Sequence, residues 1–283
     1  MNAPSMNARG AARGARVLIF DSGLGGLTVL AAIARQRPDA ELIYAADDAF
    51  FPYGALAEAA LIARVGSVMA SLIERHRPDL AVIACNSAST LVLPPLRAAF
   101  PRLPFVGTVP AIKPAAQASR TRLVSVLATP GTVARDYTRA LVRDFAGDCH
   151  VTLVGSALLA GLAEAFLRGE AIDEAEVARE IAPCFVERGD HRTDHVVLAC
   201  THFPLLMEPF VRLAPWPVEF VDPAPAIARR VDALLGKRGA PRGSEALSPA
   251  IFTSGRPPSV ELQKALRRHG LTATSAGERA AAI

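Results

Sequence analysis

The sequence predicts an α/β fold of two similar domains, each a mostly parallel sheet flanked by helices, related by a pseudo-two-fold axis with a shared site in the cleft between them. Three observations support this prediction: strand-like runs alternate with helical patterns, one segment repeats along the chain, and a cysteine ends each copy of the repeat. Parallel sheets covered on both faces have strands of this continuous apolar kind.

The strand-like runs are short, apolar and often β-branched. They cover residues 17–20, 42–45, 81–84, 123–127, 151–154, 196–199 and 218–221. Longer helical patterns at residues 56–76, 156–168 and 173–187 lie between them. Alternation of strand and helix is typical of right-handed crossovers in a parallel sheet.

The internal repeat appears at a shift of 115 residues, the spacing between Cys85 and Cys200. A His-Arg-x-Asp sequence begins at His76 and again at His191, and each is followed by an apolar strand, a cysteine and a small polar residue. A weaker echo relates residues 16–20, before Asp21-Ser22-Gly23, to residues 122–127. We expect a duplicated half-unit, with ligands held beyond the carboxyl ends of the strands.

The repeat suggests where the chain divides. We expect residues 16–108 together with 222–270 to form the first domain and residues 109–221 to form the second. A last strand at 251–254 and a helix at 260–269 return to the first domain. The tails, 1–15 and 271–283, lack apolar patterning and are predicted to be disordered.

Composition excludes several functional classes. The chain has 283 residues, of which 51% are hydrophobic, enough for a substantial core. A net charge of +4, spread over the helices, does not suggest nucleic-acid binding. No apolar run approaches the roughly 18 residues of a membrane span, and the first residues lack a secretory signal, so we expect a cytoplasmic protein. The four scattered cysteines fit neither a disulfide framework nor a metal knuckle.

Cys85 and Cys200 are the candidate reactive groups. Either cysteine alone is equally well explained as a small core residue. Two symmetry-related cysteines, each at the end of a strand, suit a reaction that removes a proton from one face of a carbon and returns one to the other. A strand-to-helix turn is expected to lower the pKa of such a thiol toward neutrality. Cys149 and Cys184 have no partner of this kind and are interpreted as structural.

The turn at residues 21–28 is rich in glycine and could hold an anion on its backbone N–H groups. A nucleotide site is the alternative, with Asp47 as a ribose ligand. The spacing Gly23-x-Gly25-Gly26 departs from Gly-x-Gly-x-x-Gly, and the lysine of a P-loop is missing. The carboxylate of an amino acid is a sufficient anion for this turn.

Several longer motifs resemble those of glutamate racemases, within the aspartate/glutamate racemase superfamily. The resemblance extends from about residue 16 to 230 and is carried by Phe20-Asp21-Ser22-Gly23-Leu24-Gly25-Gly26-Leu27, Asp47 with Pro52-Tyr53-Gly54, Ala84-Cys85-Asn86-Ser87-Ala88-Ser89, Gly107-Thr108-Val109-Pro110-Ala111, Ala128-Thr129-Pro130-Gly131-Thr132 and Cys200-Thr201-His202-Phe203-Pro204-Leu205-Leu206.

The resemblance implies a role for each motif residue. Cys85 would serve the D-glutamate face with help from Asp21, and Cys200 the L-glutamate face. His202 and Glu164 would assist Cys200. Substrate binding would fall to Ser22, Tyr53, Gly54, Asn86, Ser87, Thr129, Thr132 and Thr201. Ser87 replaces a usual Thr and Phe203 a frequent Tyr, changes that we expect to alter packing more than binding.

No cofactor is expected. Pyridoxal phosphate needs a buried lysine, and Lys113, Lys237 and Lys264 are poorly placed for one. No residues have metal-ligand spacing. The resemblance implies that glutamate is the substrate and that the protein works in peptidoglycan synthesis. It also implies a possible homodimer, since the family often dimerises, and regulation by a cell-wall precursor, as in some proteobacterial relatives.

Two alternatives remain open. Another two-cysteine enzyme, an aspartate or hydantoin racemase, has similar chemistry, although His202 stands where aspartate racemases usually carry Glu. A non-catalytic binding protein of the same two-domain build is the second alternative. Such a protein would not require both Cys85 and Cys200.

Overall fold

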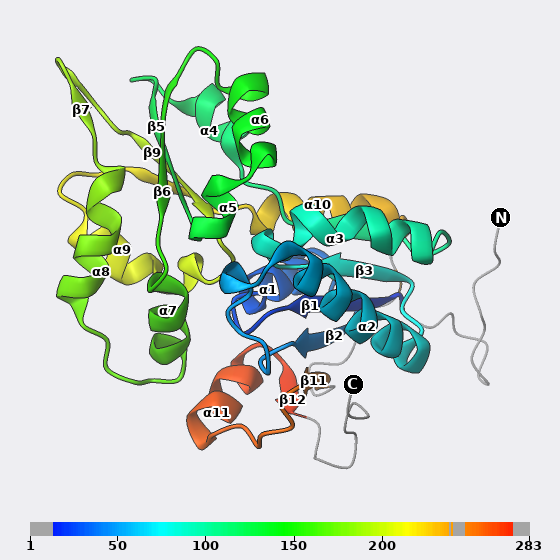
Figure 1. Ribbon diagram of the computed structural model, residues 1–283. Helices are drawn as coiled ribbons and strands as arrows, with labels where there is room; N and C mark the ends of the chain where they lie inside the picture. The colour runs from blue at the N-terminus through cyan, green and yellow to red at the C-terminus, as the bar shows by residue number, and fades with distance from the viewer. Residues whose placement is uncertain (1–13, 238, 240–246, 274–283) are drawn as a thin grey trace.

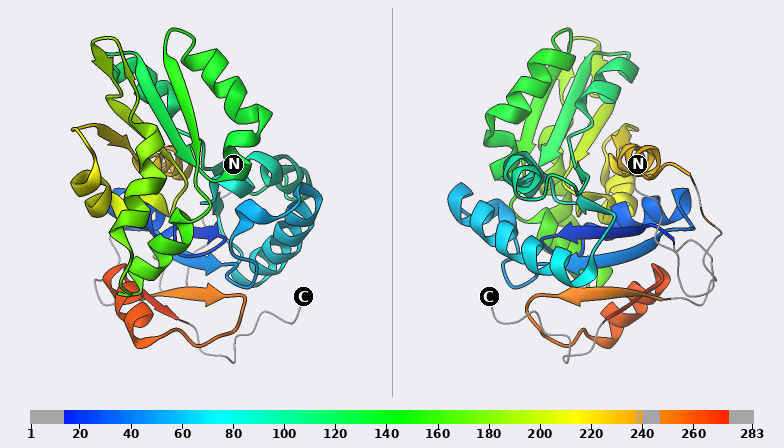
Figure 2. Two further views of the ribbon diagram at one scale, coloured as in Figure 1. Left: turned by 60° about the vertical axis from the view of Figure 1, so that its left-hand side comes forward. Right: turned by 90° about the vertical axis from the view of Figure 1, so that its right-hand side faces the viewer.

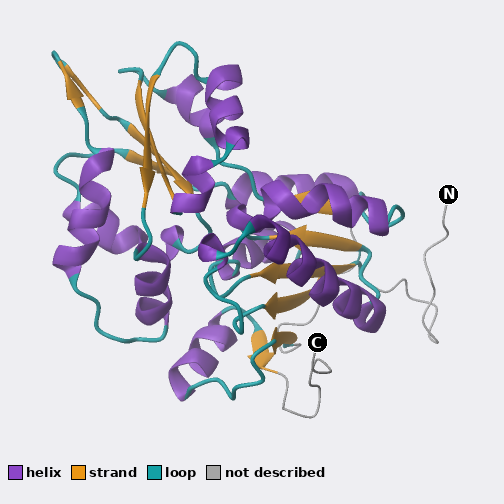
Figure 3. Ribbon diagram, viewed as in Figure 1, coloured by secondary structure: helices purple, strands orange, loops and turns teal. Residues whose placement is uncertain are grey.

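The computed structural model describes residues 14–237, 239 and 247–273. The chain forms two main sheets, and each sheet is packed between helices. The two helix–sheet–helix halves lie side by side (Figure 1). Figure 3 shows that the strands of each sheet lie between helices on both faces. The predicted fold class, α/β with two similar parallel-sheet domains, is confirmed.

The first sheet has the strand order β12-β11-β2-β1-β3-β4, and all its neighbouring strands are parallel. Its strands are β1 (Arg16–Asp21), β2 (Glu41–Ala46), β3 (Leu80–Ile83), β4 (Phe105–Gly107), β11 (Ser248–Phe252) and β12 (Leu271–Ala273). Strand β1 is buried on both faces, because Val17 and Ile19 pack into one core cluster while Leu18 and Phe20 pack into another. This explains its uninterrupted apolar sequence.

Helices cover both faces of the first sheet. They are α1 (Leu27–Gln36), α10 (Ala224–Leu235) and α11 (Val260–Arg268) on one face, and α2 (Glu58–His76) and α3 (Asn86–Ala99) on the other. A short 3-10 turn, η1 (Tyr53–Ala55), precedes α2. Arg37, at the end of α1, is 1% exposed and forms an ion pair of 2.8 Å with Asp39, which ties the α1–β2 loop.

The second sheet has the order β10-β9-β5-β6, again parallel throughout. Its strands are β5 (Leu123–Ala128), β6 (His150–Gly155), β9 (His195–Ala199) and β10 (Glu219–Val221). Helices α7 (Leu159–Leu167), α8 (Glu174–Ile181) and α9 (Met207–Leu213) share a core cluster with one face, and α4 (Ile112–Ala118), α5 (Pro130–Ala134) and α6 (Asp136–Phe145) lie toward the other. The turns η2 (Ala182–Cys184) and η3 (Phe203–Leu206) and a hairpin of β7 (Glu187–Arg188) and β8 (His191–Arg192) complete this half.

The duplication predicted from sequence is visible in the topology. The order β2-β1-β3-β4 in the first sheet has the same chain sequence and the same parallel pairing as β6-β5-β9-β10 in the second. Figure 2 shows the two sheets from further directions. Strands β3 and β9, which precede the two cysteines, therefore occupy equivalent places beside β1 and β5.

Only the Asp of the repeated His-Arg-x-Asp sequence has the same structural role in both halves. Asp79 and Asp194 are equivalent, since each accepts backbone N–H groups from the segment that leads into the neighbouring strand. His76, by contrast, ends helix α2, whereas His191 lies in the β7–β8 hairpin. The shared His-Arg pair therefore carries no common structure.

The C-terminal segment differs from the sequence expectation. The tail predicted to be disordered from residue 271 begins instead with β12, because Leu271 is fully buried and this short strand pairs with β11. Strand β11 also begins earlier than the predicted residues 251–254. Residues 1–13 and 274–283 of the predicted tails lie outside the described part of the chain. The domain boundaries at 108/109 and 221/222 stay a prediction.

Candidate active site

The carboxyl ends of the equivalent strands in both sheets meet at one cavity. Cys85 follows β3 and is the residue before α3, while Cys200 follows β9. Both side chains line this small cavity, together with residues from both halves: Ser22, Phe51, Pro52, Tyr53, Gly54, Asn86, Ser87, Thr129, Ala160, Thr201 and His202. Both cysteines are reduced and buried, with 5% and 7% of their surface exposed.

The surroundings of Cys85 come from the first strand. Its Sγ donates to the Ser22 hydroxyl at 3.8 Å. Asp21, fully buried at the end of β1, accepts the backbone N–H groups of Ser22 at 2.8 Å and Gly26 at 2.5 Å. The Thr201 hydroxyl, from the other half of the molecule, donates to the same carboxylate at 3.5 Å. Asp21 therefore lies behind Ser22 and not on the cavity wall.

The expected lowering of the Cys85 pKa by its helix is wrong for the protein alone. Burial raises the pKa of the Cys85 thiol well above its usual range, and the negative charge of Asp21 adds to this effect. The backbone N–H of Ala88, in the first turn of α3, acts in the opposite direction but is outweighed. Desolvation wins because a helix terminus stabilises a thiolate by less than full burial costs it.

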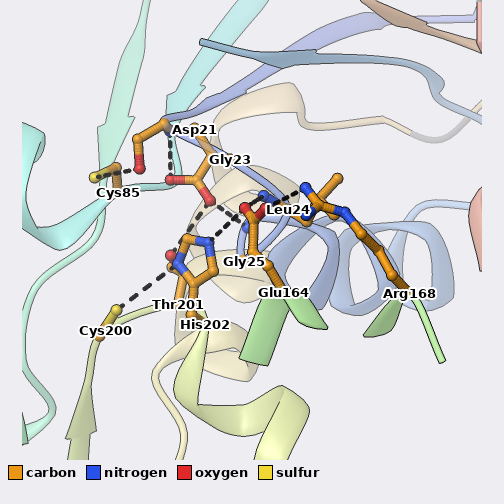
Figure 4. A network of polar contacts seen from close by, with 12 residues as sticks. Asp21, Gly23, Leu24, Gly25, Cys85, Glu164, Arg168, Cys200, Thr201 and His202 are labelled. Atoms are coloured by element: carbon orange, nitrogen blue, oxygen red, sulfur yellow. Dashed lines mark hydrogen bonds and ion pairs between the residues drawn. The ribbon is translucent and has the colours of Figure 1, made fainter. Parts of the chain in front are cut away.

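The surroundings of Cys200 form a chain of polar contacts (Figure 4). The Sγ atom lies 3.8 Å from Nδ1 of His202, whose Nε2 lies 3.2 Å from Oε1 of Glu164. Glu164 comes from α7 and is 5% exposed, so it is not the solvated mid-helix glutamate that its sequence position suggests. Like Asp21, it lies behind the cavity wall.

Opposite charges determine the protonation of this second network. Burial lowers the pKa of His202, but Cys200 and Glu164 outweigh it and hold the pKa well above its usual value. Burial raises the pKa of Glu164, and here too the contacts prevail, since His202 and the backbone N–H of Leu24 lower it. The pair is therefore an imidazolium beside a carboxylate.

The glycine-rich turn binds carboxylates of the protein itself. Besides the bonds to Asp21, the backbone N–H of Leu24 donates to Oε1 of Glu164 at 2.9 Å. A Cβ at Gly23 would lie 2.1 Å from that same oxygen, and one at Gly25 would lie 2.5 Å from Nδ1 of His202. The glycines of this turn let the first half approach His202 and Glu164, and a ligand carboxylate on its remaining N–H groups stays a prediction.

The surroundings of Asp47 argue against a nucleotide site in which this residue binds the ribose. This carboxylate is fully buried and already has partners. It binds Arg64 through both oxygens, at 2.7 and 2.9 Å, and accepts hydroxyl donors from Tyr53 and Thr253 at 2.5 Å. A ribose has no free acceptor here, and Asp47 instead fixes the loop that carries Tyr53 and Gly54.

Asn86 is the clearest ligand-binding group of the cavity. It is 2% exposed, yet neither its Oδ1 nor its Nδ2 has a hydrogen-bonding partner within the described residues. A buried carboxamide without partners costs about 1 to 3 kcal/mol. Because Asn86 lines the cavity, a polar ligand there would satisfy both a donor and an acceptor.

Three hydroxyls form a cluster beside Asn86. The Ser87 Oγ lies 3.1 Å from Thr129 Oγ1 and 3.4 Å from Thr132 Oγ1, and the two threonine hydroxyls are 3.0 Å apart. Ser87 and Thr129 line the cavity, whereas Thr132 is fully buried behind them. Thr132 contacts Thr129, which caps helix α5, and direct binding of substrate by Thr132 stays a prediction.

Sequence reasoning missed several residues at the site. The Phe51 ring packs 5.2 Å from the His202 ring and lines the cavity, but a loop phenylalanine gives no signal of this kind. Arg168 forms an ion pair with Glu164 at 2.6 Å, a contact that the spacing of four residues along a helix could have suggested. Arg135, at the start of α6, binds the Ser87 carbonyl across the cleft.

Within residues 14–237 and 247–273, no set of three or more His, Cys, Asp or Glu side chains is arranged to hold a metal ion. In the same part of the chain, no helix has the length and apolar character needed to cross a membrane.

Comparison with known proteins agrees with this geometry. The family described as Asp/Glu/Hydantoin racemase matches residues 21–231. A glutamate racemase of Sinorhizobium fredii is 54% identical over 263 residues, covering 92% of this chain and 97% of the relative. One from Brucella anthropi is 54% identical over 255 residues, covering 90% and 92%.

Solved structures give the same result. The crystal structure of Escherichia coli glutamate racemase in complex with L-glutamate and the activator UDP-MurNAc-Ala has a TM-score of 0.84 and 42% identity, covering 92% of this chain and 97% of that one. Glutamate racemase from Aquifex pyrophilus has a TM-score of 0.69 at 27% identity, covering 92% and 97%. With two cysteines from equivalent strands on one cavity, and with matches over most of its length, this chain belongs to the Asp/Glu/Hydantoin racemase family.

Proposed function

We propose that this protein is a glutamate racemase that interconverts L- and D-glutamate without a cofactor, by proton transfer between Cys85 and Cys200. The observation that carries the proposal is that both thiols, from equivalent strands of two similar halves, line one small cavity. The relatives with 54% identity are named glutamate racemases, which supports glutamate as the substrate.

The reaction moves one proton off the α-carbon and another onto it. One cysteine, as thiolate, takes the α-proton and becomes a thiol, leaving a carbanion conjugated with the α-carboxylate. The thiol on the other face then gives its proton to that carbon and becomes the thiolate. The bonds balance without any redox step, and the enzyme is left ready for the opposite enantiomer.

The surroundings of the two thiols suggest how each is supported. His202 beside Cys200 is positively charged, so it stabilises a Cys200 thiolate and can return a proton to it. Cys85 has no such cation, and burial holds it as a thiol in the protein alone. The ammonium group of a bound amino acid supplies a positive charge in the same cavity, and we propose that it offsets this cost.

Substrate binding is assigned to the polar cavity wall. The proposed contacts are the unpartnered Asn86 carboxamide and the hydroxyls of Ser87, Thr129 and Thr201. These groups supply donors for two carboxylates and acceptors for one ammonium. The Tyr53 hydroxyl is bound to Asp47, so we propose that Tyr53 shapes the cavity without donating to the substrate.

The decisive experiment is exchange in deuterated water. The purified protein is incubated separately with L-glutamate, D-glutamate and the two aspartate enantiomers, and α-deuterium is followed by NMR with chiral analysis of the products. We expect labelling and inversion of both glutamate enantiomers and none of aspartate. Preferential labelling of aspartate would assign the protein to another branch of the family, and no labelling would refute racemisation of either.

A cellular role and its regulation follow from the same proposal. We propose that the protein works in the cytoplasm and supplies D-glutamate for peptidoglycan. The E. coli structure is described with UDP-MurNAc-Ala as an activator, which supports regulation of this chain by the same cell-wall precursor. Initial rates with and without UDP-MurNAc-Ala test this regulation, and a rate that is unchanged at saturating precursor contradicts it.

A further inference from the structure

Arg168 is a charged residue next to the active site that none of the roles above includes. It follows the last residue of helix α7, one turn beyond Glu164, and its side chain is 37% exposed. Its Nη2 donates to Oε2 of Glu164 at 2.6 Å. In Figure 4 the guanidinium approaches the carboxylate from the side away from His202. Arg168 is not among the residues that line the cavity.

This contact occupies the second oxygen of Glu164. The first oxygen, Oε1, already accepts two donors, the backbone N–H of Leu24 and Nε2 of His202. With Oε2 bound by Arg168, both ends of the carboxylate are fixed, so its plane cannot rotate away from His202. The imidazole is held in turn with Nδ1 at 3.8 Å from the Cys200 sulfur.

Charge balance gives Arg168 a second role. Asp21, at the end of β1, is a second buried carboxyl group of this network: it raises the pKa of His202, while the charge of Glu164 raises the pKa of Asp21. Tyr44, from β2, faces the same network but is un-ionised, because burial raises its pKa well above the usual value. His202 and Arg168 are the two cations that pair with Glu164, and both lower its pKa.

We propose that Arg168 is a positioning residue of the racemase: its guanidinium keeps Glu164 ionised and aligned, and Glu164 thereby keeps His202 charged beside Cys200. The inference rests on the proposed function for its assay, but it concerns only the Cys200 side of the site. Cys85 and Ser22, on the other side, have no contact with Arg168 among the interactions described.

The competing explanation is purely structural. A cation at the carboxyl end of α7 stabilises the helix by a favourable interaction with the helix dipole, whatever it does for Glu164. This role would make Arg168 substitutions lower the thermal stability and leave the chemistry unchanged. The experiment must therefore separate stability from the pH dependence of turnover.

Three variants make this separation. Arg168→Gln removes the charge and Arg168→Lys keeps it. Arg212→Gln is the matched control, because Arg212 also pairs with a glutamate four residues earlier in its helix, at 3.3 Å, but on the exposed surface of α9. Glutamate racemisation is measured as kcat and KM over the pH range in which each protein stays folded.

We expect Arg168→Gln to lower kcat about tenfold with a smaller change in KM, since alignment of the acid–base groups is lost and not the binding wall. Without the guanidinium, Glu164 takes up a proton at higher pH, so the acid limb of the kcat profile should move up by about one pH unit. Arg168→Lys should have a kcat and an acid limb close to those of the parent protein, because the positive charge is kept. Arg212→Gln should match the parent protein.

A double-mutant cycle provides the sharpest outcome. If Arg168 acts through Glu164, Arg168→Gln should have almost no further effect on kcat in a Glu164→Gln background. Additive losses, or an Arg168→Gln profile that is lower by the same factor at every pH, would overturn the inference. Inactivity of the parent protein toward glutamate would instead refute the proposed function, so the two failures are distinguishable.

Discussion

Glu164 and Leu24 lie on opposite sides of the cleft, and the carboxylate of Glu164 accepts the backbone N–H of Leu24 at 2.9 Å. Thr201 makes a second link, since its hydroxyl donates to Asp21 and its carbonyl accepts the Thr28 hydroxyl at 3.3 Å. The groups that surround the two cysteines are thus the groups that join the two halves.

Removal of either thiol should stop racemisation in both directions. Cys85→Ala and Cys200→Ala each delete one of the two proton carriers, and we expect the rate of glutamate inversion to fall by at least about a thousandfold. Circular dichroism should remain that of the parent protein. Cys184→Ala is the control: this buried cysteine lies in the core of the second half, away from the cavity, so its loss should cost about 1 kcal/mol of stability and little activity. Parent-like inversion by either site variant would refute the two-thiol mechanism.

Asn86→Leu should make the protein more stable and less active. Its carboxamide is buried without partners, and an apolar side chain removes that cost, so we expect the free energy of unfolding to rise by about 1 kcal/mol in urea titrations. Turnover should fall by about a hundredfold or more because the substrate loses its partner. Ser89→Ala, in the same helix, is the contrast: its hydroxyl has partners at Ile83 and Thr108, so its removal should destabilise. A destabilised but active Asn86→Leu protein would contradict this account.

Gly25→Ala should displace His202. The new Cβ would lie 2.5 Å from Nδ1 and 2.6 Å from the backbone nitrogen of His202, and the backbone cannot yield as a flexible side chain would. We expect kcat to fall by about a hundredfold, since small displacements of acid–base groups have effects of this size. Gly66→Ala, inside α2 with no atom of a neighbouring element within 4 Å of the added Cβ, should keep full activity and gain about 1 kcal/mol in the free energy of unfolding. Equal activity of both variants would exclude the close approach.

The Asp194 carboxylate should make the free energy of unfolding depend on pH in the acid range. Burial raises its pKa, but the Ser119 hydroxyl, His195 and backbone N–H groups outweigh this and lower the pKa to about 2. A lowered pKa stabilises the fold above the unfolded value of 3.8, and this contribution is lost as the pH falls through about 2. Asp194→Asn should therefore cost about 2 kcal/mol at pH 7 and progressively less below pH 4.

The matched control for Asp194 is Asp148→Asn. Asp148 forms an ion pair with Arg122, but its side chain is 66% exposed, and exposed pairs of this kind contribute little. Urea unfolding at neutral and acid pH should therefore show almost no change in this variant. If Asp194→Asn lowers the free energy of unfolding equally at every pH, the charge of Asp194 is not the source of its contribution.

The sequence was most informative where one local pattern has one structural meaning. The apolar runs predicted seven strands of the two sheets, and the repeat at Cys85 and Cys200 predicted that β3 and β9 are equivalent. Strand β4 and the two-residue strands of the hairpin were missed, because none of them lies in an apolar run of four residues. Their formation depends on neighbouring strands that are distant in sequence.

The candidate site was predictable in composition but not in arrangement. The sequence cannot reveal that the backbone N–H of Leu24 is bound by Glu164, because the two residues are 140 positions apart. Nor can it show that burial dominates the pKa of Cys85, since the surrounding atoms come from both halves. Such properties depend on tertiary contacts and so appear only with the fold.

The matching strand order of the two sheets carries a last consequence. The two cysteines follow equivalent strands of the two sheets, but Cys85 faces a hydroxyl and Cys200 faces an imidazole. Enantiomers have equal free energies in water, so no asymmetry of the catalyst can favour one product at equilibrium. The unequal neighbours can give the two directions different kcat and KM values, but the two kcat/KM ratios must stay equal.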